Sequence, residues 1–534
     1  MLLIITPSGF LSAVTPLKIH KDQTGILTTI VTLENVYRDY TQGDKAEKVK
    51  CCIADHQKQG YRFVMLVGDS DTFPVRFTKT DSYDPNAFNT AFYPTDLYYA
   101  ALYKQDGSFD NWDANNNGYY GELNGETHTG PINIDQVNLV PTVAVCRVPA
   151  STLDEVDRYV KKVIHYEQQS YGANWVKSTL LMATDDWFAD ACKVQQRIAE
   201  NYLKGDTNTI LCTEAGNLTS SAITQKFNLG VVLVGYIGHG DVSELQIPGD
   251  YWGVHNIPQL TNVDCLPVMP VAACSTGAFA TAPPYSPYVD VNNVDHKGVV
   301  NGEIFTSVPP QPSCLQTLTD PDKDLATNLT VRTSAGVIAY LGGITGMQMY
   351  EPVEYFIQGL PKFVTVGEAW QWMIQRFYEV QGLPGSLSKP DWFEVARAHQ
   401  PWKYMLFGDP SLRIAGKPIL ILKGKEDYEV NGITFTRFNL EISNYDIYPD
   451  KLFSPAPDLP PCGSNPNASR TWVDIFDGSN NQRIYGFCAL NHAEDLRGIW
   501  FAIQKGQQIP NTVCIKMIDR RTGNLYQSNT LSLK

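Results

Sequence analysis

The sequence predicts an α/β protein, in which helices cover a parallel β-sheet, followed by a separate all-β sandwich. Over residues 1–415, short apolar runs alternate with amphipathic segments, which is the pattern of parallel strands joined by helices. After residue 415 the pattern changes to alternating segments such as Thr434–Ile442 and Trp472–Phe476. Clusters of Pro, Gly and Asn separate these segments, as is typical of a β-sandwich.

Apolar runs of strand length define the predicted sheet, and amphipathic segments define its helices. Leu153–Tyr171 places Val156 and Val160 on one face, as the helical period requires. Val194–Leu203 and Glu368–Val380 have the same pattern. The predicted strands are Leu2–Thr6, Leu27–Leu33, Phe63–Val67, Leu139–Cys146, Thr179–Ala183, Val231–Ile237, Val268–Ala273 and Gly336–Leu341.

The length of 534 residues predicts about three domains or subdomains. We place them at residues 1–172, 173–415 and 416–534. The stretch from about 282 to 325 is rich in Pro, Asn, Val and Asp without a period, so we interpret it as an inserted loop. This loop either covers the cleft, as a lid or an inhibitory segment, or is a surface loop without such a role.

The formal net charge of −14 argues against a nucleic-acid partner, which requires clustered Lys and Arg. The charge fits an acidic, soluble protein, and it either favours cationic substrates or serves solubility alone. No apolar run is long enough to span a membrane. The N-terminus has no basic region or cleavage site of a signal peptide, so it is interpreted as a buried strand. We expect a monomer.

The 11 cysteines show neither a CxxC pair nor metal-ligand spacing. Their odd number leaves at least one thiol free or intermolecular, so a reactive cysteine is admissible. Composition alone does not choose which one.

Two predicted strands end in residues that suit thiol catalysis. Val231–Ile237 leads into Gly238-His239-Gly240, and Val268–Ala273 leads into Cys274. Ligands of α/β sheets bind beyond the carboxyl ends of the strands, so Cys274 is a candidate nucleophile and His239 its acid–base partner. The N–H groups of Gly240 and Cys274 are candidates for an oxyanion hole. The alternative is a buried core thiol beside a loop histidine.

These two blocks resemble the caspase-like clan of cysteine peptidases, and further segments resemble its gingipain family, peptidase family C25. The resemblance implies two caspase-like α/β subdomains followed by an immunoglobulin-like sandwich. It also implies Cys274 as nucleophile and His239 as general acid. The matching segments are Val64–Asp69, Val143–Arg147, His165–Glu167, Tyr236–Gly240, Val271–Cys274, Gly336–Tyr340 and Phe407–Leu412.

The resemblance further implies a carboxylate that orients the histidine, and Asp186 aligns best with it. Asp185 is the neighbouring alternative, and both suit the capping of a helix. A buried acid that binds a basic P1 side chain aligns with Asp190, and Met347–Tyr350 resembles the wall of the S1 pocket. Tyr350 is therefore a candidate substrate-binding residue, with core packing as the alternative. We expect cleavage after Arg or Lys.

A separate segment resembles a calcium loop. Asp113, Asn115, Asn117 and Glu122 supply oxygen-bearing side chains around a glycine turn. The spacing departs from that of an EF-hand, and Asn- and Gly-rich stretches also form ordinary turns. We expect a structural calcium ion here and no cofactor in catalysis.

Taken together, the sequence predicts a cysteine endopeptidase that cuts protein or peptide substrates through a thioester. One alternative is a sortase-like transpeptidase, in which an amine intercepts the acyl-enzyme. Another is a surface-binding protein whose peptidase domain is inactive. The resemblance implies a secreted or cell-surface location, although the cysteine content leaves a cytosolic one open.

Overall fold

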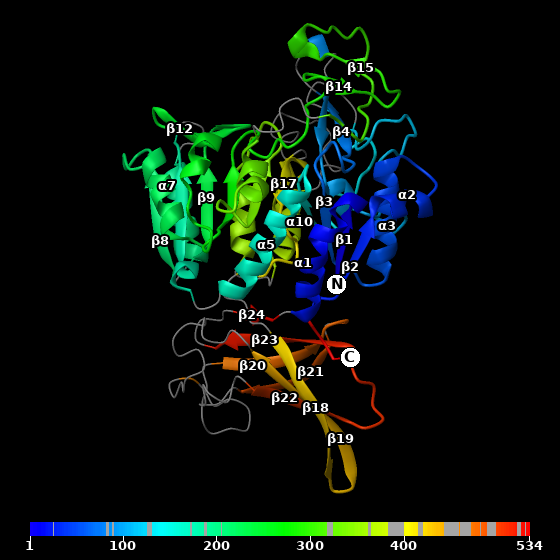
Figure 1. Ribbon diagram of the computed structural model, residues 1–534, viewed down its shortest axis with the longest axis vertical. Helices are drawn as coiled ribbons and strands as arrows, with labels where there is room; N and C mark the ends of the chain where they lie inside the picture. The colour runs from blue at the N-terminus through cyan, green and yellow to red at the C-terminus, as the bar shows by residue number, and fades with distance from the viewer. Residues whose placement is uncertain are drawn as a thin grey trace.

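The computed structural model describes most of the chain, and Figure 1 shows its layout. The described residues are 1–24, 26–81, 85–87, 90–124, 131–170, 173–185, 190–203, 206–317, 324–360, 365–382, 400–414, 420–442, 459, 471–480, 482–488, 498–520, 525–528 and 530–533.

A 10-stranded sheet forms the centre of the α/β part. Its first four strands come from residues 1–172 and its other six from residues 173–415, so the two predicted subdomains share one sheet. In sheet order the strands are β2 (Thr28–Thr32), β1 (Leu2–Thr6), β3 (Phe63–Val67), β6 (Ala144–Val148), β17 (Tyr404–Phe407), β16 (Ala339–Gly343), β13 (Val268–Ala272), β9 (Leu233–Ile237), β7 (Ser178–Ala183) and β8 (Thr207–Cys212).

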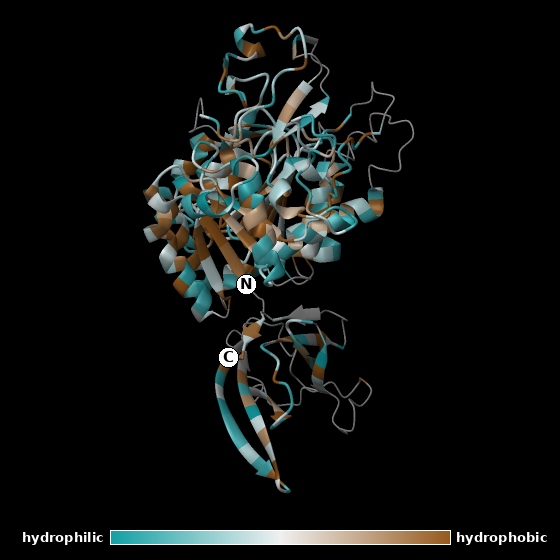
Figure 2. Cartoon of the chain, turned by 90° about the vertical axis from the view of Figure 1, so that its right-hand side faces the viewer, coloured by the Kyte–Doolittle hydropathy of each residue, from teal (hydrophilic) through white to brown (hydrophobic). Residues whose placement is uncertain are grey.

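Helices cover this sheet, and the interior strands are mainly hydrophobic (Figure 2). The helix α5 (Leu153–Gln169) begins at a capping box formed by Thr152 and Glu155. The other α-helices are α1 (Leu11–Gln23), α2 (Leu33–Asp39), α3 (Lys45–Lys58), α4 (Leu97–Ala100), α6 (Ala191–Tyr202), α7 (Ser220–Leu229), α8 (Leu325–Thr327), α9 (Glu351–Gly359) and α10 (Val366–Gln381). The shorter helical turns are η1 (Ser8–Phe10), η2 (Pro85–Ala87), η3 (Asn174–Lys177), η4 (Val254–Gln259), η5 (Val299–Asn301) and the π-helix η6 (Asn328–Arg332).

Short hairpins project from the α/β part. One of them, formed by Tyr288–Val289 and Asp295–His296, lies in the region 282–325. In the same region, the Gln311 amide donates to the Phe77 carbonyl at 2.8 Å. In Figure 1 this hairpin lies at the end opposite to the C-terminal sheets. The hairpin strands are β4 (Phe77–Asp81), β5 (Thr90–Pro94), β10 (Gly240–Asp241), β11 (Glu244–Ile247), β12 (Asp250–Gly253), β14 (Tyr288–Val289) and β15 (Asp295–His296).

The C-terminal part is all-β, as predicted, and forms two separate sheets. Within one of these sheets, Phe438 stacks on Phe501 of the neighbouring strand, with ring centroids 5.1 Å apart. Of the described residues, no helix is long and apolar enough to span a bilayer. The strands are β18 (Leu420–Val430), β19 (Ile433–Ile442) and β22 (Gly498–Gln504) in one sheet, and β20 (Thr471–Asp477), β21 (Arg483–Cys488), β23 (Thr512–Asp519), β24 (Leu525–Gln527) and β25 (Leu531–Ser532) in the other.

Each predicted strand of the α/β part has a counterpart, but some bounds were wrong. The strand expected at Leu139–Cys146 begins at Ala144 and continues to Val148. Leu139 and Val143 are buried loop residues that precede the strand. They are apolar because they pack in the core, although they do not belong to the sheet. The predictions also omitted β8, in which Thr207, Asn208 and Thr209 precede a short apolar end, and β17, which is only four residues long.

The strand β17 is anchored by a buried ionic network at its C-terminal side. Lys21 Nζ lies 2.7 Å from Asp409 Oδ2 and 2.7 Å from Glu167 Oε1, and its side chain is 0% exposed. His20 Nε2 lies 2.8 Å from the other oxygen of Glu167. Burial opposes ionisation of Glu167, but Lys21, His20 and Arg413 together lower its pKa to about 2. The network joins α1, α5 and the segment after β17.

Replacing Lys21 by Met should lower the free energy of unfolding by about 3–5 kcal/mol, because two buried carboxylates lose their cation. Denaturant unfolding measures the change. Lys18→Met is the matched control on the same helix, since the Lys18–Asp22 pair is partly exposed and should contribute under about 0.5 kcal/mol. Equal effects of the two substitutions would contradict this account of the network.

Candidate active site

The register of two neighbouring strands places His239 opposite Cys274. The parallel strands β9 and β13 pair Ile237 with Ala272, and each candidate residue lies two positions beyond its paired residue. Adjacent strands are about 4.8 Å apart, so the two residues begin side by side at the same edge of the sheet. The Gly238 N–H donates to the Ala272 carbonyl at 3.1 Å and carries the pairing past the strand end.

Gly240 packs directly against the turn that carries the thiol. A Cβ atom at this position would lie 2.8 Å from Thr276 Cγ2 and 2.9 Å from Ala273 Cβ. The Gln246 N–H donates to the His239 carbonyl, so Gly240 occupies the next, non-hydrogen-bonded position of the hairpin. Its own N–H therefore points away from β11, and its part in an oxyanion hole stays a prediction.

The thiol of Cys274 stands on a sharp turn and is partly exposed. Ser275 follows it with a φ of 58°, which is a left-handed conformation that a residue with a side chain rarely adopts. The Met347 N–H donates to Cys274 Sγ at 3.3 Å. Neither feature was predicted, because a serine gives no signal of left-handed backbone and Met347 acts through its main chain.

The orienting carboxylate predicted at Asp186 lies outside the described residues, so its role stays a prediction. Its neighbour Asp185 accepts a hydrogen bond from the Cys192 N–H at 3.1 Å and so caps the start of α6. A disulfide joins Cys192 to Cys212 at the end of β8. This bond was not predicted, because Cys192 on α6 and Cys212 on β8 meet only when α6 packs against β8.

The two predicted substrate-binding residues have different surroundings. Asp190 has a φ of 71°, its side chain is 60% exposed, and it forms an ion pair with Lys193. Asp190 is therefore not the buried acid that the resemblance implies. Tyr350 is buried at the start of α9; burial raises the pKa of its hydroxyl, and a hydrogen bond with Arg197 opposes that rise. Substrate binding by either residue stays a prediction.

In the predicted calcium loop, the oxygens already have partners. Asp113 Oδ1 accepts the Asn117 N–H at 2.9 Å. The side-chain amides of Asn115 and Asn117 each donate to Glu122 at 2.8 Å, and Lys79 Nζ lies 2.7 Å from the other Glu122 oxygen. Within the described ranges, no three His, Cys, Asp or Glu residues are grouped to hold a metal ion. Calcium binding would require Lys79 to leave Glu122, and it stays a prediction.

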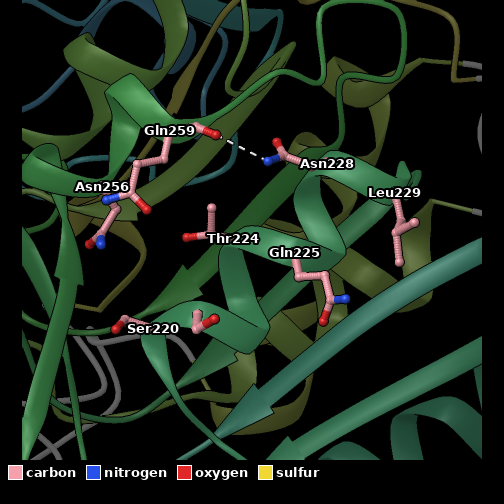
Figure 3. Close-up of a pocket in the computed structure, with 8 residues that line it drawn as sticks. Ser220, Thr224, Gln225, Asn228, Leu229, Asn256 and Gln259 are labelled. Atoms are coloured by element: carbon pink, nitrogen blue, oxygen red, sulfur yellow. Dashed lines mark hydrogen bonds between the residues drawn. The ribbon is translucent and has the colours of Figure 1, made fainter.

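A polar hollow of about 570 Å³ lies elsewhere, between α7 and η4 (Figure 3). The Asn228 amide donates to the Gln259 carbonyl across it at 3.0 Å. None of the predicted site residues lines this hollow, so it is separate from the candidate active site. Its lining residues are Ser220, Ser221, Thr224, Gln225, Asn228, Leu229, Asn256 and Gln259.

Comparison with known proteins gives a consistent result. The family model described as peptidase family C25 matches residues 1–415. Gingipain R2 of Porphyromonas gingivalis is 24% identical over 274 residues, which cover 49% of this chain and 30% of the relative. Gingipain R1 of the same species is 24% identical over 49% of this chain and 23% of the relative. The aligned part is thus less than a third of these curated relatives.

Solved structures support the fold. The complex of Porphyromonas gingivalis RgpB pro- and mature domains superposes with a TM-score of 0.54 at 14% identity, covering 100% of both chains. The structure described as the Arg-specific cysteine proteinase gingipain R gives 0.53 at 14% identity, covering 99% of this chain and 97% of the other. This similarity confirms the predicted fold class, a caspase-like α/β part followed by a β-sandwich.

Replacing Gly240 by Ala should lower any activity that depends on Cys274 and His239 by about 10²-fold, because the new Cβ forces the two turns apart. Gly9→Ala is the control, since a Cβ there meets no atom within 4 Å. The measurement is turnover, alongside a melting temperature that shows both variants folded. Unchanged turnover in Gly240→Ala would show that the close approach is not needed.

Calcium should raise the melting temperature if the loop at 113–122 binds it. Addition of millimolar calcium and then excess chelator, followed by thermal unfolding, measures this. Glu122→Gln should abolish the response, whereas Glu429→Gln in the C-terminal part should keep it. The same melting temperature with calcium and with chelator would contradict calcium binding by this loop.

Proposed function

The chain belongs to peptidase family C25, and from that premise we propose that it is a cysteine endopeptidase with Cys274 as nucleophile and His239 as acid–base partner. The observation that carries the proposal is the strand register, which sets these residues side by side at one edge of the sheet. A nucleophile and a base within reach of each other are the minimum that acyl transfer requires.

In the proposed reaction, the Cys274 thiolate attacks the scissile carbonyl carbon and a C–S bond forms. The carbonyl oxygen becomes an oxyanion, which the N–H groups of Gly240 and Cys274 stabilise. The protonated His239 then gives its proton to the leaving nitrogen as the C–N bond breaks. A thioester and a free amine result.

Hydrolysis completes the cycle. Neutral His239 takes a proton from water, and the resulting hydroxide adds to the thioester carbonyl. The C–S bond breaks, the carboxylic acid product leaves, and the thiolate and imidazolium return. The N–H of Met347, 3.3 Å from the sulfur, supports the thiolate at the start and end of the cycle because it donates a hydrogen bond to it.

We propose a preference for Arg or Lys at P1. One related solved structure is described as Arg-specific, and the net charge of −14 suits cationic substrates. In the structure Asp190 is paired with Lys193, so a P1 side chain would have to replace that lysine. We also propose secretion or display at the cell surface, because the Cys192–Cys212 disulfide is typical of oxidising compartments. A monomeric state remains a prediction.

An acyloxymethyl ketone with arginine at P1, followed by peptide mapping, tests the nucleophile. We expect an adduct on Cys274 alone, and a loss of peptidase activity on the order of 10⁴-fold in Cys274→Ala. Cys265→Ala is the matched control, because Cys265 is also a partly exposed free thiol. This variant should be labelled on Cys274 to the same extent as the wild type.

The possible outcomes test the identity of the nucleophile and the P1 preference separately. An adduct only with a probe that carries an apolar P1 residue would keep the peptidase and reject the basic preference. No adduct on Cys274 with any probe, in reduced and folded protein, would overturn the proposed function.

A further inference from the structure

The direction of β17 brings a lysine to the edge of the sheet where Cys274 stands. β17 is antiparallel to β16 and pairs Tyr404 with Gly343, the last residue of β16. Lys403 therefore lies beyond the carboxyl end of β16, next to the corresponding end of β13. The Ile344 N–H donates to the Lys403 carbonyl at 2.9 Å and continues this pairing.

The side chain of Lys403 holds the loop that follows β16, which we define as residues 344–349. Its Nζ donates to the Gly346 carbonyl at 2.9 Å and to Gln348 Oε1 at 3.0 Å. The Tyr404 hydroxyl donates to the Met349 carbonyl at 3.0 Å. Since Lys403 is only 4% exposed, these contacts are shielded from water and fix the backbone of the loop.

The same loop contacts the nucleophile. The Met347 N–H donates to Cys274 Sγ, and the Ser275 N–H donates to the Thr345 carbonyl at 3.0 Å. A Cβ at Gly343 would lie 2.5 Å from Met347 Cγ, so the loop folds back tightly on the strand end. A displacement of the loop would therefore move the hydrogen-bond donor at the sulfur.

Lys403 also places a buried positive charge behind the thiol. Within the described ranges, no carboxylate lies within ion-pair distance of its Nζ. Burial lowers the pKa of Lys403 to about 8, and the Cys274 thiolate acts in the opposite direction. A cation near a cysteine in general favours the thiolate form of that residue.

The other titratable groups that face Lys403 are few. The ring of Tyr93 lies 5.5 Å from Nζ, and burial raises the pKa of Tyr93. Burial, with a smaller contribution from Glu351, likewise raises the pKa of Tyr404. Both phenols stay neutral near pH 8. Of these three groups, Lys403 is therefore the one that changes charge in that range.

We propose that Lys403 is a positioning residue for the nucleophile, which holds the loop 344–349 against Cys274 and stabilises the thiolate with its charge. The inference rests on Cys274 as the nucleophile of the proposed peptidase. A purely structural lysine would fix the loop without changing the ionisation of the thiol. Lys162 exemplifies that case, because it is buried and donates to main-chain carbonyls such as Leu329 and Ala335, away from the site.

The experiment is the pH dependence of Cys274 alkylation by iodoacetamide, quantified by mass spectrometry in the full chain. Lys403→Gln keeps a hydrogen-bond donor and removes the charge, and Lys403→Arg keeps the charge. We expect Lys403→Gln to raise the midpoint of alkylation by about one pH unit, and Lys403→Arg to stay near the wild type. Lys162→Gln is the control and should lower stability without moving the midpoint.

Two results would overturn the inference: an unchanged midpoint in Lys403→Gln, or an equal shift in Lys162→Gln. If Lys403→Gln lacks a cooperative unfolding transition, Lys403→Met, which preserves the packing of the stem, is measured in its place and judged in the same way. Iodoacetamide reports the thiol whether or not the chain is a peptidase. A failure of the proposed function, shown by peptidyl probes, is therefore distinguishable from a failure of this inference.

Discussion

The side chain of Lys21 is fully buried between the carboxylates of Glu167 and Asp409. The position of β17 depends on this contact. Burying three charges is costly unless each is paired. The network meets that condition only when α1, α5 and the segment after β17 come together. It therefore ties the first helix of the chain to a strand almost four hundred residues later in the sequence.

The strand β17 carries this constraint across the sheet. It pairs with β16 and also meets β6 through Phe407 and Arg147, so it joins strands from both halves of the α/β part. Gly408 packs beside Ala339 at the beginning of β16, whereas Lys403 lies at its end. One short antiparallel strand thus connects the ionic network at one edge of the sheet to the turn of Cys274 at the other.

At the edge of the sheet that carries Cys274, backbone segments pack directly against one another because glycines leave no side chains between them. Gly240 and Gly343 each leave no room for a Cβ, and Ser275 adopts a left-handed conformation between them. Such features persist only where the surroundings define them strongly. Here the parallel pairs of β9 with β13 and β13 with β16 supply that definition. Lys403 and Tyr404 hold the loop 344–349 by hydrogen bonds, and this loop contacts the sulfur of Cys274 through the Met347 N–H.

The sequence by itself determined the layers of the fold and most strand positions, and it identified His239 and Cys274 as a candidate pair, because apolar periodicity and glycine-flanked strand ends are local signals. Tertiary structure alone decided the place of Lys403 and the donor at Met347, since they reach Cys274 through an antiparallel strand and a main-chain N–H. It also decided the exposure of Asp190 and the pairing of Glu122 with Lys79. Those outcomes depend on which charges meet, and residues distant in the sequence meet only after the sheet has formed.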